Sequence, residues 1–312
     1  MRHAEQVRAA VEARDDHSPR TVSWRRCVAL HGLDPERRLE PVVVEEQWLV
    51  EARERARPVL DAAQPELDKL FSVFGRAGCC LVLTDETGLA IERRGVPADD
   101  RAFRDVGLMP GARWDEQSVG TNGIGTALAE TRPIGIFRDE HFLTACAGLS
   151  CATAPIRDHR GRLAGALDLS SARDDMNEVI LGLYLHAARE AASQVEARLF
   201  RAAFPKARIV LAGGAGGRHG LVALDRDDIV IGANAAARRA LSIDDAWLAS
   251  GHPASDLFGE DCLVSGGGFE AAERRTVRAA LAKADGNVSA AAKALGISRA
   301  TLHRKISRLE IR

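Results

Sequence analysis

No stretch of the 312-residue chain approaches the roughly 18 to 20 consecutive apolar residues that a membrane-spanning helix requires. The first 14 residues are rich in charge and contain no apolar core of the kind found in a signal peptide. These absences argue against a membrane protein and against a secreted one. We therefore expect the chain to work in the cytoplasm, with no membrane partner.

Cysteine is scarce, and none of the six cysteines forms a CxxC pair. A disulfide scaffold and a structural zinc finger both need closely spaced cysteines, so neither class fits and reduced thiols are expected. Apolar residues, by contrast, make up 46% of the chain, which is ample for packed cores. At about 150 residues a domain, the length indicates at least two domains.

The chain as a whole carries almost no net charge, since its formal net charge is −1. The charge is unevenly distributed: residues 270–312 contain ten basic and four acidic residues, a net +6, so the rest of the chain carries −7. A basic segment joined to an acidic one is typical of a nucleic-acid-binding module, although a solvated helical surface has the same pattern. The preceding residues 265–268, SGGG, indicate a hinge and a domain boundary.

Three helices are predicted in this basic segment, at residues 269–284, 287–295 and 298–309. Asn287 and Ser298 stand before the second and third helices, and both have side chains that commonly cap a helix N-terminus. The turn before the third helix contains glycine, and the third helix itself is basic with a single apolar stripe. Two short helices joined by such a turn have the geometry of a helix-turn-helix.

Residues 286–311, GNVSAAAKALGISRATLHRKISRLEI, closely resemble the Fis-type helix-turn-helix found at the end of many bacterial transcription activators. The alternative is a plain three-helix packing module. The resemblance implies a homodimer that binds double-stranded DNA, with the two third helices in successive major grooves about 34 Å apart. Its candidate DNA contacts are Ser298, Arg299, Thr301 and Arg304 for bases or phosphates, and Asn287, Ser289, His303, Lys305 and Arg308 for the backbone.

Strands and helices are mixed in the first 200 residues. Hairpins are predicted at residues 78–92 and 151–169, each with Asp and Gly in its turn, and a helical pattern covers residues 176–200. The expected fold class is therefore α+β. We divide the chain into an amino-terminal domain at 1–200, a connector at 201–264, and the linker and basic domain at 265–312.

Five motifs in the amino-terminal domain resemble the GAF sensor of the acetoin-catabolism activator family. They are SWRRC (residues 23–27), GLDP (32–35), SVGTNGIGTALAETRPI (118–134), DEHF (139–142) and GRLAGALDLSS (161–171). The resemblance implies an antiparallel sheet with helices and a small alcohol, diol, ketone or aromatic compound as effector, bound between the sheet and the segments above it.

Family members also carry an ATPase that acts on RNA polymerase containing sigma-54. This sequence has neither a GxxxxGK[ST] phosphate loop nor a GAFTGA motif, and its glycine-rich residues 213–217 lack the following Lys and Ser or Thr. ATP hydrolysis and sigma-54 activation therefore do not carry over from the resemblance.

Polar side chains gather around the glycine-rich residues 118–126, where glycines let backbone donors approach a small ligand. The candidate ligand-binding residues are Trp114, Ser118, Thr121, Asn122, Thr126, His141 and Phe142. The same residues also suit a structural role, in which they build a turn and the start of a helix.

His141, Cys146 and Cys151 are weak candidates for a metal site or a redox switch, with the adjacent Cys79 and Cys80 in a nearby strand. Buried cysteine, however, usually behaves as a small apolar residue. No grouping of nucleophile, base and orienting residue is recognisable, so we predict neither enzyme activity nor a bound cofactor.

The connector has apolar runs followed by Asn234 and a short helical pattern, which weakly resembles a PAS-like module; an irregular connector is the alternative. Together the patterns predict a homodimeric, ligand-responsive transcription regulator of either sign, with RNA polymerase as a candidate partner. Two alternatives stay open: a redox- or metal-sensing transcription factor, and a protein that modulates a sigma-54 activator without binding DNA.

Overall fold

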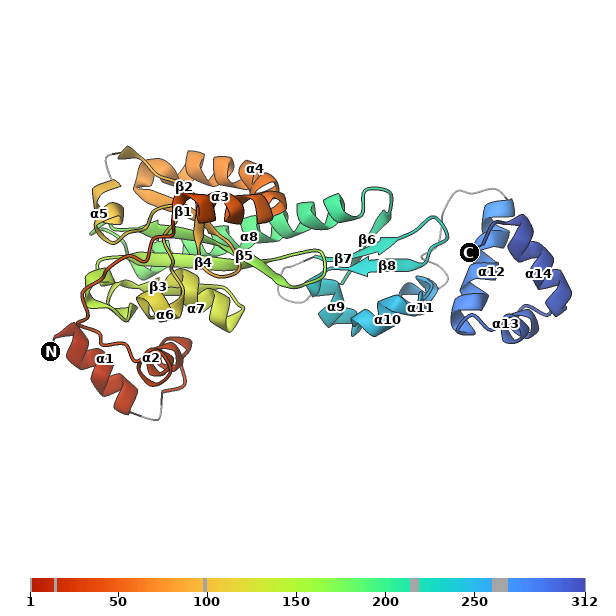
Figure 1. The fold of residues 1–312 in the computed structure, drawn as a ribbon, viewed down its shortest axis with the longest axis horizontal. Helices are drawn as coiled ribbons and strands as arrows, with labels where there is room; N and C mark the ends of the chain where they lie inside the picture. The colour runs from red at the N-terminus through yellow and green to blue at the C-terminus, as the bar shows by residue number, and fades with distance from the viewer. Residues whose placement is uncertain (1, 14–15, 98–99, 214–218, 260–268, 312) are drawn as a thin grey trace. The chain divides into compact units, whose positions relative to one another are not determined.

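Two compact units make up the computed structural model (Figure 1). The first comprises residues 1–158 and 163–199, and the second comprises residues 159–162 and 200–312. The structure describes residues 2–13, 16–97, 100–213, 219–259 and 269–311. The predicted hinge at 265–268, the boundary beside it and most of the glycine-rich stretch lie outside the described residues, and the three-part division of the chain stays a prediction.

The first unit is built on a five-stranded antiparallel sheet with the strand order β2-β1-β5-β4-β3. Both predicted hairpins are confirmed, because β1 pairs with β2 and β4 pairs with β5. Strand β5 also pairs with β1, which joins the two hairpins at the centre of the sheet. The strands are β1 Cys79–Thr84, β2 Ala90–Arg94, β3 Ile134–Phe137, β4 Ser150–Arg157 and β5 Leu163–Ser171.

Some helices of the first 203 residues, including α2 and α7, begin at a capping side chain. Ser18 accepts a hydrogen bond from the backbone of Thr21, and Asn122 accepts one from Gly125. The helices are α1 His3–Glu12, α2 Pro19–Ala29, α3 Glu46–Arg55, α4 Arg57–Phe74, α5 Asp100–Asp105, α6 Glu116–Val119, α7 Gly123–Glu130 and α8 Glu178–Ala203, with 3-10 turns η1 Gly75–Ala77, η3 Arg138–Glu140 and η4 Thr144–Cys146.

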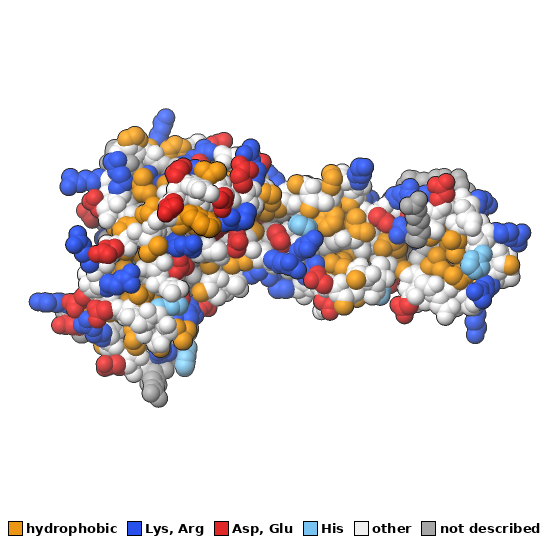
Figure 2. Space-filling model, in the orientation of Figure 1, with side chains coloured by type: hydrophobic (Ala, Val, Ile, Leu, Met, Phe, Trp, Pro, Cys, Tyr) orange, Lys and Arg blue, Asp and Glu red, His pale blue; other side chains and the backbone are white. Residues whose placement is uncertain are grey.

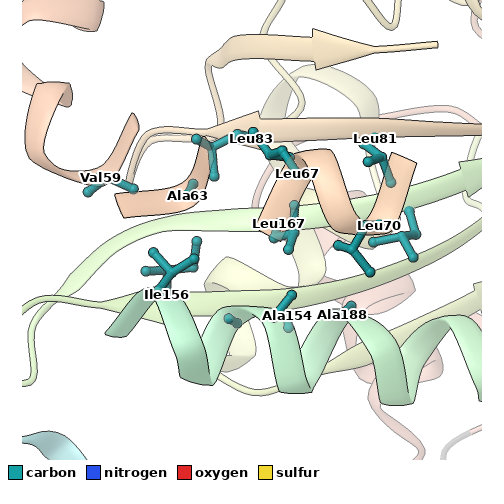
Figure 3. Packing of buried hydrophobic residues seen from close by; sticks show 14 of the residues in the cluster. Val59, Ala63, Leu67, Leu70, Leu81, Leu83, Ala154, Ile156, Leu167 and Ala188 are labelled. Carbon is teal, nitrogen blue, oxygen red and sulfur yellow. The ribbon is translucent and has the colours of Figure 1, made fainter. Parts of the chain in front are cut away.

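Side chains alternate along the strands, so the sheet has two apolar faces. One face carries Leu81, Leu83 and Leu167 and is covered by α4 and α8 (Figure 3). The other face packs against a second core that includes side chains of α2, α6 and α7. The α+β fold class with an antiparallel sheet is therefore confirmed, and the second face carries the glycine-rich segment of interest.

The second unit contains a three-stranded antiparallel sheet, β6-β7-β8. As predicted, a strand runs into Asn234, whose side chain caps the following helix through Ala237 N at 2.9 Å. Whether this is a PAS-like module stays a prediction. The elements are β6 Arg208–Ala212, β7 Gly220–Leu224, β8 Val230–Ala233, α9 Ala235–Leu241, α10 Asp245–Ala249 and α11 Ser255–Phe258.

Three helices form the carboxy-terminal part of this unit, close to the predicted bounds: α12 Phe269–Lys283, α13 Val288–Ala294 and α14 Arg299–Arg308. Their core contains Val277, Ala291 and Leu302, so each helix contributes to it. Among the described residues, no helix combines the length and the apolar character needed to cross a membrane.

Candidate functional site

The glycine-rich segment between α6 and α7 is part of the interior of the first unit. Six of the seven predicted ligand residues are buried, and Ser118 is half-buried. Asn122 uses its side-chain amide within the segment, because it accepts from Gly125 N at 2.9 Å and donates to the Gly120 carbonyl at 2.8 Å. The Asn122 side chain therefore builds the turn and the start of α7, which is the structural role that the sequence also allowed for it.

Two glycines of this segment stand where no side chain fits. Gly120 has a φ of +72°, and a Cβ there would lie 2.7 Å from the Phe142 ring. A Cβ on Gly123 would lie 3.0 Å from the Asp168 carboxylate. Phe142 N also donates to the Thr121 carbonyl at 3.0 Å, so the motifs at 118–134 and 139–142 are in direct contact.

A chain of buried polar groups lies beneath the N-terminus of α7. Thr153 and Ser170 each donate a hydrogen bond to the Asp168 carboxylate, both at 2.5 Å. Cys151 Sγ lies 3.0 Å from Ser170 Oγ and 3.3 Å from His141 Nε2. The sequence analysis missed Thr153 and Ser170 and assigned no role to Asp168, although a carboxylate inside an otherwise apolar strand was a usable signal.

Burial sets the protonation of this chain of groups. It raises the pKa of Asp168 to about 6, although the hydrogen bonds from Ser170 and Thr153 act in the opposite direction. Burial also lowers the pKa of His141 to about 4, against the hydrogen bond to the Arg138 carbonyl, so the imidazole is neutral at pH 7. The pKa of the Cys151 thiol lies well above its ordinary value because of burial and the nearby Asp168.

The predicted metal and redox residues are only partly brought together. His141 and Cys151 are hydrogen-bonded, whereas burial alone raises the pKa of Cys146 to about 12 and keeps that thiol protonated. Cys79 and Cys80 lie on opposite faces of the sheet, in different cores. Within the described part of the chain, no three His, Cys, Asp or Glu side chains are grouped to hold a metal ion.

A second polar network joins α2 to the α6–α7 segment. Ser23 Oγ donates to Glu116 at 2.6 Å, and Arg26 Nε pairs with the same carboxylate at 2.9 Å while its Nη1 reaches Glu130 at 2.6 Å. Burial raises the pKa of Glu116, but the hydrogen bonds from Arg26 and Ser23 outweigh it, so the net shift is downward. Two motifs about 90 residues apart in sequence are thus joined by a buried carboxylate.

The amino-terminal helices also hold the segment that contains His141. Trp24 Nε1 donates to the Glu140 carbonyl at 2.9 Å, and Arg20 pairs with the Glu140 carboxylate at 3.0 Å. His3 Nε2 lies 3.0 Å from the His141 carbonyl. Four of the five motifs quoted from the sequence therefore converge, and the sequence analysis did not identify Glu116 or the contacts that connect them.

A surface hollow of about 780 Å³ adjoins the polar network between α2 and the α6–α7 segment. Its lining includes Arg26, Arg113, Glu116 and Ser118. Of the seven predicted ligand residues only Ser118 contributes to this lining, so the hollow and the buried polar chain are separate features of the same domain.

The predicted DNA-binding residues divide into helix caps and exposed side chains. Asn287 accepts from Ser289 N at 3.0 Å and begins α13, and Ser298 accepts from Thr301 N at 3.1 Å and begins α14. The first turns of α14 expose Arg299, His303 and Arg304 to solvent.

Two of the residues predicted to contact the DNA backbone form ion pairs within the three-helix domain instead. Lys305 and Arg308 both form ion pairs with Glu273 of α12. The hydrogen bond from Lys305 contributes most to lowering the pKa of Glu273, whose net shift is downward. Figure 2 shows further Lys and Arg side chains over the part of the molecule that carries α14.

Two protein-family models match separate segments of the chain. Residues 3–197 match the model described as "MimR, N-terminal domain", and residues 268–309 match "Bacterial regulatory protein, Fis family". The first match covers more than half of the chain. The chain belongs to the MimR N-terminal domain family. Its carboxy-terminal helices are a Fis-type helix-turn-helix, as the sequence predicted.

Curated relatives support the same assignment. The acetoin catabolism regulatory protein of Cupriavidus necator is 34% identical over 174 residues, which are 56% of this chain and 26% of that protein. The propane 2-monooxygenase operon transcriptional activator MimR of Mycolicibacterium smegmatis is 33% identical over 57% of this chain and 29% of its own length. These relatives are named as regulators of transcription, and the chain spans about a quarter of their length.

Among solved structures, the fold is similar to the Escherichia coli DhaR(N)–DhaL complex. The TM-score is 0.54 at 21% identity, and the match covers 72% of this chain and 77% of that one. At this identity the likeness shows the fold alone, and it confirms the mixed α/β architecture predicted for the MimR-type chain.

Proposed function

We propose that this MimR-type protein regulates transcription by binding double-stranded DNA as a homodimer through α14. The observation that carries the proposal is that the first two turns of α14 expose two basic side chains, Arg299 and Arg304, inside a segment that matches the Fis family. In a two-fold dimer the two copies of α14 lie in successive major grooves about 34 Å apart, so the operator is a near-palindrome.

Genome-wide mapping of binding sites, followed by binding assays with the purified chain, tests this proposal. Removal of residues 269–312 should abolish operator binding. Arg299→Ala and Arg304→Ala should each cost ~1 to 3 kcal/mol if the side chain contacts a base edge in bidentate fashion. Arg101→Ala is the matched control, because Arg101 is an exposed arginine of α5 in the first unit.

Operator affinity that survives the truncation would overturn the proposal. Absence of binding to every promoter fragment, together with co-purification of a full-length sigma-54 activator, would instead support the modulator alternative.

We infer that a small neutral molecule bound by the MimR-type domain controls DNA binding. The relatives are named for acetoin catabolism and for propane 2-monooxygenase, and both names refer to small molecules. The groups around Asp168 are two hydroxyls and a carboxylate hydrogen-bonded to one another in an apolar interior, and an alcohol, diol, ketone or polar aromatic compound could exchange hydrogen bonds with them. Such an effector shifts DNA affinity only by the difference between its affinities for the two arrangements of the dimer.

Thermal unfolding of the full chain with acetoin, a three-carbon alcohol and a three-carbon ketone tests this inference. A compound of this class should raise the midpoint of the native chain but not that of Thr153→Val, which removes one buried hydroxyl. The control Thr87→Val alters a hydroxyl in the turn between β1 and β2. If no compound of the panel shifts the midpoint or the DNA affinity, the proposed effector class is wrong.

Bacterial chromosomal DNA lies in the cytoplasm, so we place the protein there. RNA polymerase is the partner through which a promoter-bound regulator would act. Binding of the DNA-bound chain to purified polymerase tests that step separately from DNA binding.

A further inference from the structure

The turn between β7 and β8 carries three aspartates that meet arginines of α12. Asp227 pairs with Arg274 and with Arg278, at 2.6 Å each, and Asp225 pairs with Arg278 at 2.7 Å. Here we call residues 225–228 the acidic turn. Its contacts reach across about 50 residues of sequence to the first helix of the three-helix domain, within the second compact unit.

The central carboxylate of the acidic turn is buried by these contacts. Only 1% of the Asp227 side chain is exposed, and Arg274 and Arg278 are 23% and 29% exposed. A carboxylate is seldom buried without paired cations, because its desolvation costs far more than a surface ion pair returns. Burial raises the pKa of Asp227, but the hydrogen bonds from Arg278 and Arg274 outweigh burial and the net shift is downward. The surroundings of Asp227 therefore favour a charged, paired carboxylate.

The turn between β1 and β2 has the same backbone hydrogen bonds as the acidic turn. Comparing the two turns shows which residues of the acidic turn its backbone does not require. Asp85 in the β1–β2 turn accepts from the backbone two and four residues ahead, at 2.9 and 3.0 Å. Asp225 does the same at 2.8 and 3.0 Å. The position with positive φ is Gly88 in the first turn, at +84°, and Asp228 in the acidic turn, at +61°.

Glycine adopts this backbone conformation without strain, whereas aspartate has a steric cost. Asp228 therefore stands where the turn alone favours glycine. Its side chain is 8% exposed and pairs with Arg208 of β6 and with Arg275 of α12 at 3.4 Å. The pair with Arg208 lies within the strand module, and the 3.4 Å approach of Arg275 from α12 gives a second physical reason for a carboxylate at this position.

We propose that the acidic turn is an intramolecular docking surface for α12, and that docking withholds Arg274, Arg275 and Arg278 from DNA. The occupant is a named segment of this chain, and charge complementarity specifies it. Three aspartates face three arginines of α12, while the one cation within the turn, Arg226, lies farther from Asp227, at 3.7 Å. Docking also holds the three-helix domain on the β6-β7-β8 module, so a change in that module moves α14. The consequence for DNA rests on the proposed function, whereas docking itself does not.

Hydrogen exchange of α12 amides in the full chain tests docking without any DNA. Asp228→Gly removes the carboxylate while placing the residue that the backbone favours, so faster exchange in α12 would come from the lost ion pairs and not from a damaged turn. We expect exchange to accelerate roughly tenfold in Asp228→Gly and in Asp227→Asn. Asp105→Asn is the control, since it neutralises an exposed aspartate that pairs with Arg101 in α5.

A double-mutant cycle assigns the effect to the pair. If Asp227 acts through Arg274, then Asp227→Asn should have a smaller effect on exchange in the Arg274→Gln background than in the native chain. Equal effects in both backgrounds, or unchanged exchange in Asp228→Gly, would overturn the docking surface.

The salt dependence of DNA binding tests the second half of the proposal. Each phosphate contact adds about 0.9 to the slope of log affinity against log salt concentration. If docking withholds the arginines, the Arg274→Gln/Arg278→Gln variant keeps the native slope, and Asp225→Asn/Asp227→Asn has a steeper one. A slope reduced by about two in the arginine variant would show that these side chains contact DNA. If the chain bound no DNA, the proposed function would be wrong, but the hydrogen-exchange experiment would still test docking.

Discussion

At the scale of single residues, Asp168 is the most unusual group in the first unit. Its carboxylate is fully buried, and its hydrogen-bond partners are the neutral hydroxyls of Thr153 and Ser170. Neutral donors stabilise a buried carboxylate less than a paired arginine does, which explains why burial raises the pKa of Asp168 to about 6 whereas the net shift of the paired Asp227 is downward.

This raised pKa predicts a pH dependence of stability. The ordinary value is 3.8, so between about pH 4 and pH 6 the folded chain holds a proton that the unfolded chain has lost. The contribution of Asp168 to the free energy of unfolding therefore falls as the pH rises through this window. Asp168→Asn should remove that dependence, which for this pKa shift amounts to about 2 to 3 kcal/mol across the window.

The difference between the urea-unfolding profiles of the native chain and of Asp168→Asn between pH 4 and pH 7 measures this effect, because the buried neutral His141 makes stability rise with pH over the same window. Asp61→Asn is the control, because Asp61 is an exposed carboxylate paired with Arg57 and should leave the profile unchanged. A steep fall in stability between pH 4 and pH 6 that persists in Asp168→Asn would contradict the assignment to this residue.

At the scale of elements, α14 depends on its cap. Ser298 Oγ accepts from Thr301 N at 3.1 Å, and the helix it begins is ten residues long. A helix this short is marginal in water without packing and capping. The cap therefore fixes the start of the surface that is proposed to meet DNA.

Removing this cap predicts a graded loss. Ser298→Ala should lower the free energy of unfolding of the three-helix domain by about 1 kcal/mol, whereas Ser298→Asn should retain most of it because asparagine also caps. Hydrogen exchange of α14 amides in the full chain measures the difference. Ser307→Ala, at an exposed position of the same helix, is the control. Equal exchange in Ser298→Ala and Ser307→Ala would show that the cap contributes nothing.

At the scale of the whole molecule, ion pairing redistributes the charge that the sequence places in the tail. Residues 270–312 carry a net +6, but Arg274, Arg275 and Arg278 meet the acidic turn, and Lys305 and Arg308 meet Glu273. Arg299 and Arg304 stay exposed at the start of α14. The surface available to DNA is therefore smaller and more localised than the net charge suggests.

The sequence predicted the two hairpins, the three carboxy-terminal helices and the caps at Asn287 and Ser298. These features depend on neighbouring residues: alternation makes a strand, a 3.6-residue period makes a helix, and a short polar side chain caps it. The sequence analysis made no prediction for Glu116 and assigned no role to Asp168, because their contacts join residues far apart in the chain. No local pattern shows that Ser23 and Arg26 meet Glu116.

The sequence by itself indicated the family, the sensor domain and the helix-turn-helix, because each is marked by short motifs of neighbouring residues that can be read without the fold. The surroundings of each polar side chain depended on folding. Folding buried six of the seven predicted ligand residues, made His141 neutral, and paired the arginines of α12 with aspartates about 50 residues away. Burial and pairing arise from contacts across the fold, and the free energy of a charge depends on those contacts more than on its neighbours in the chain.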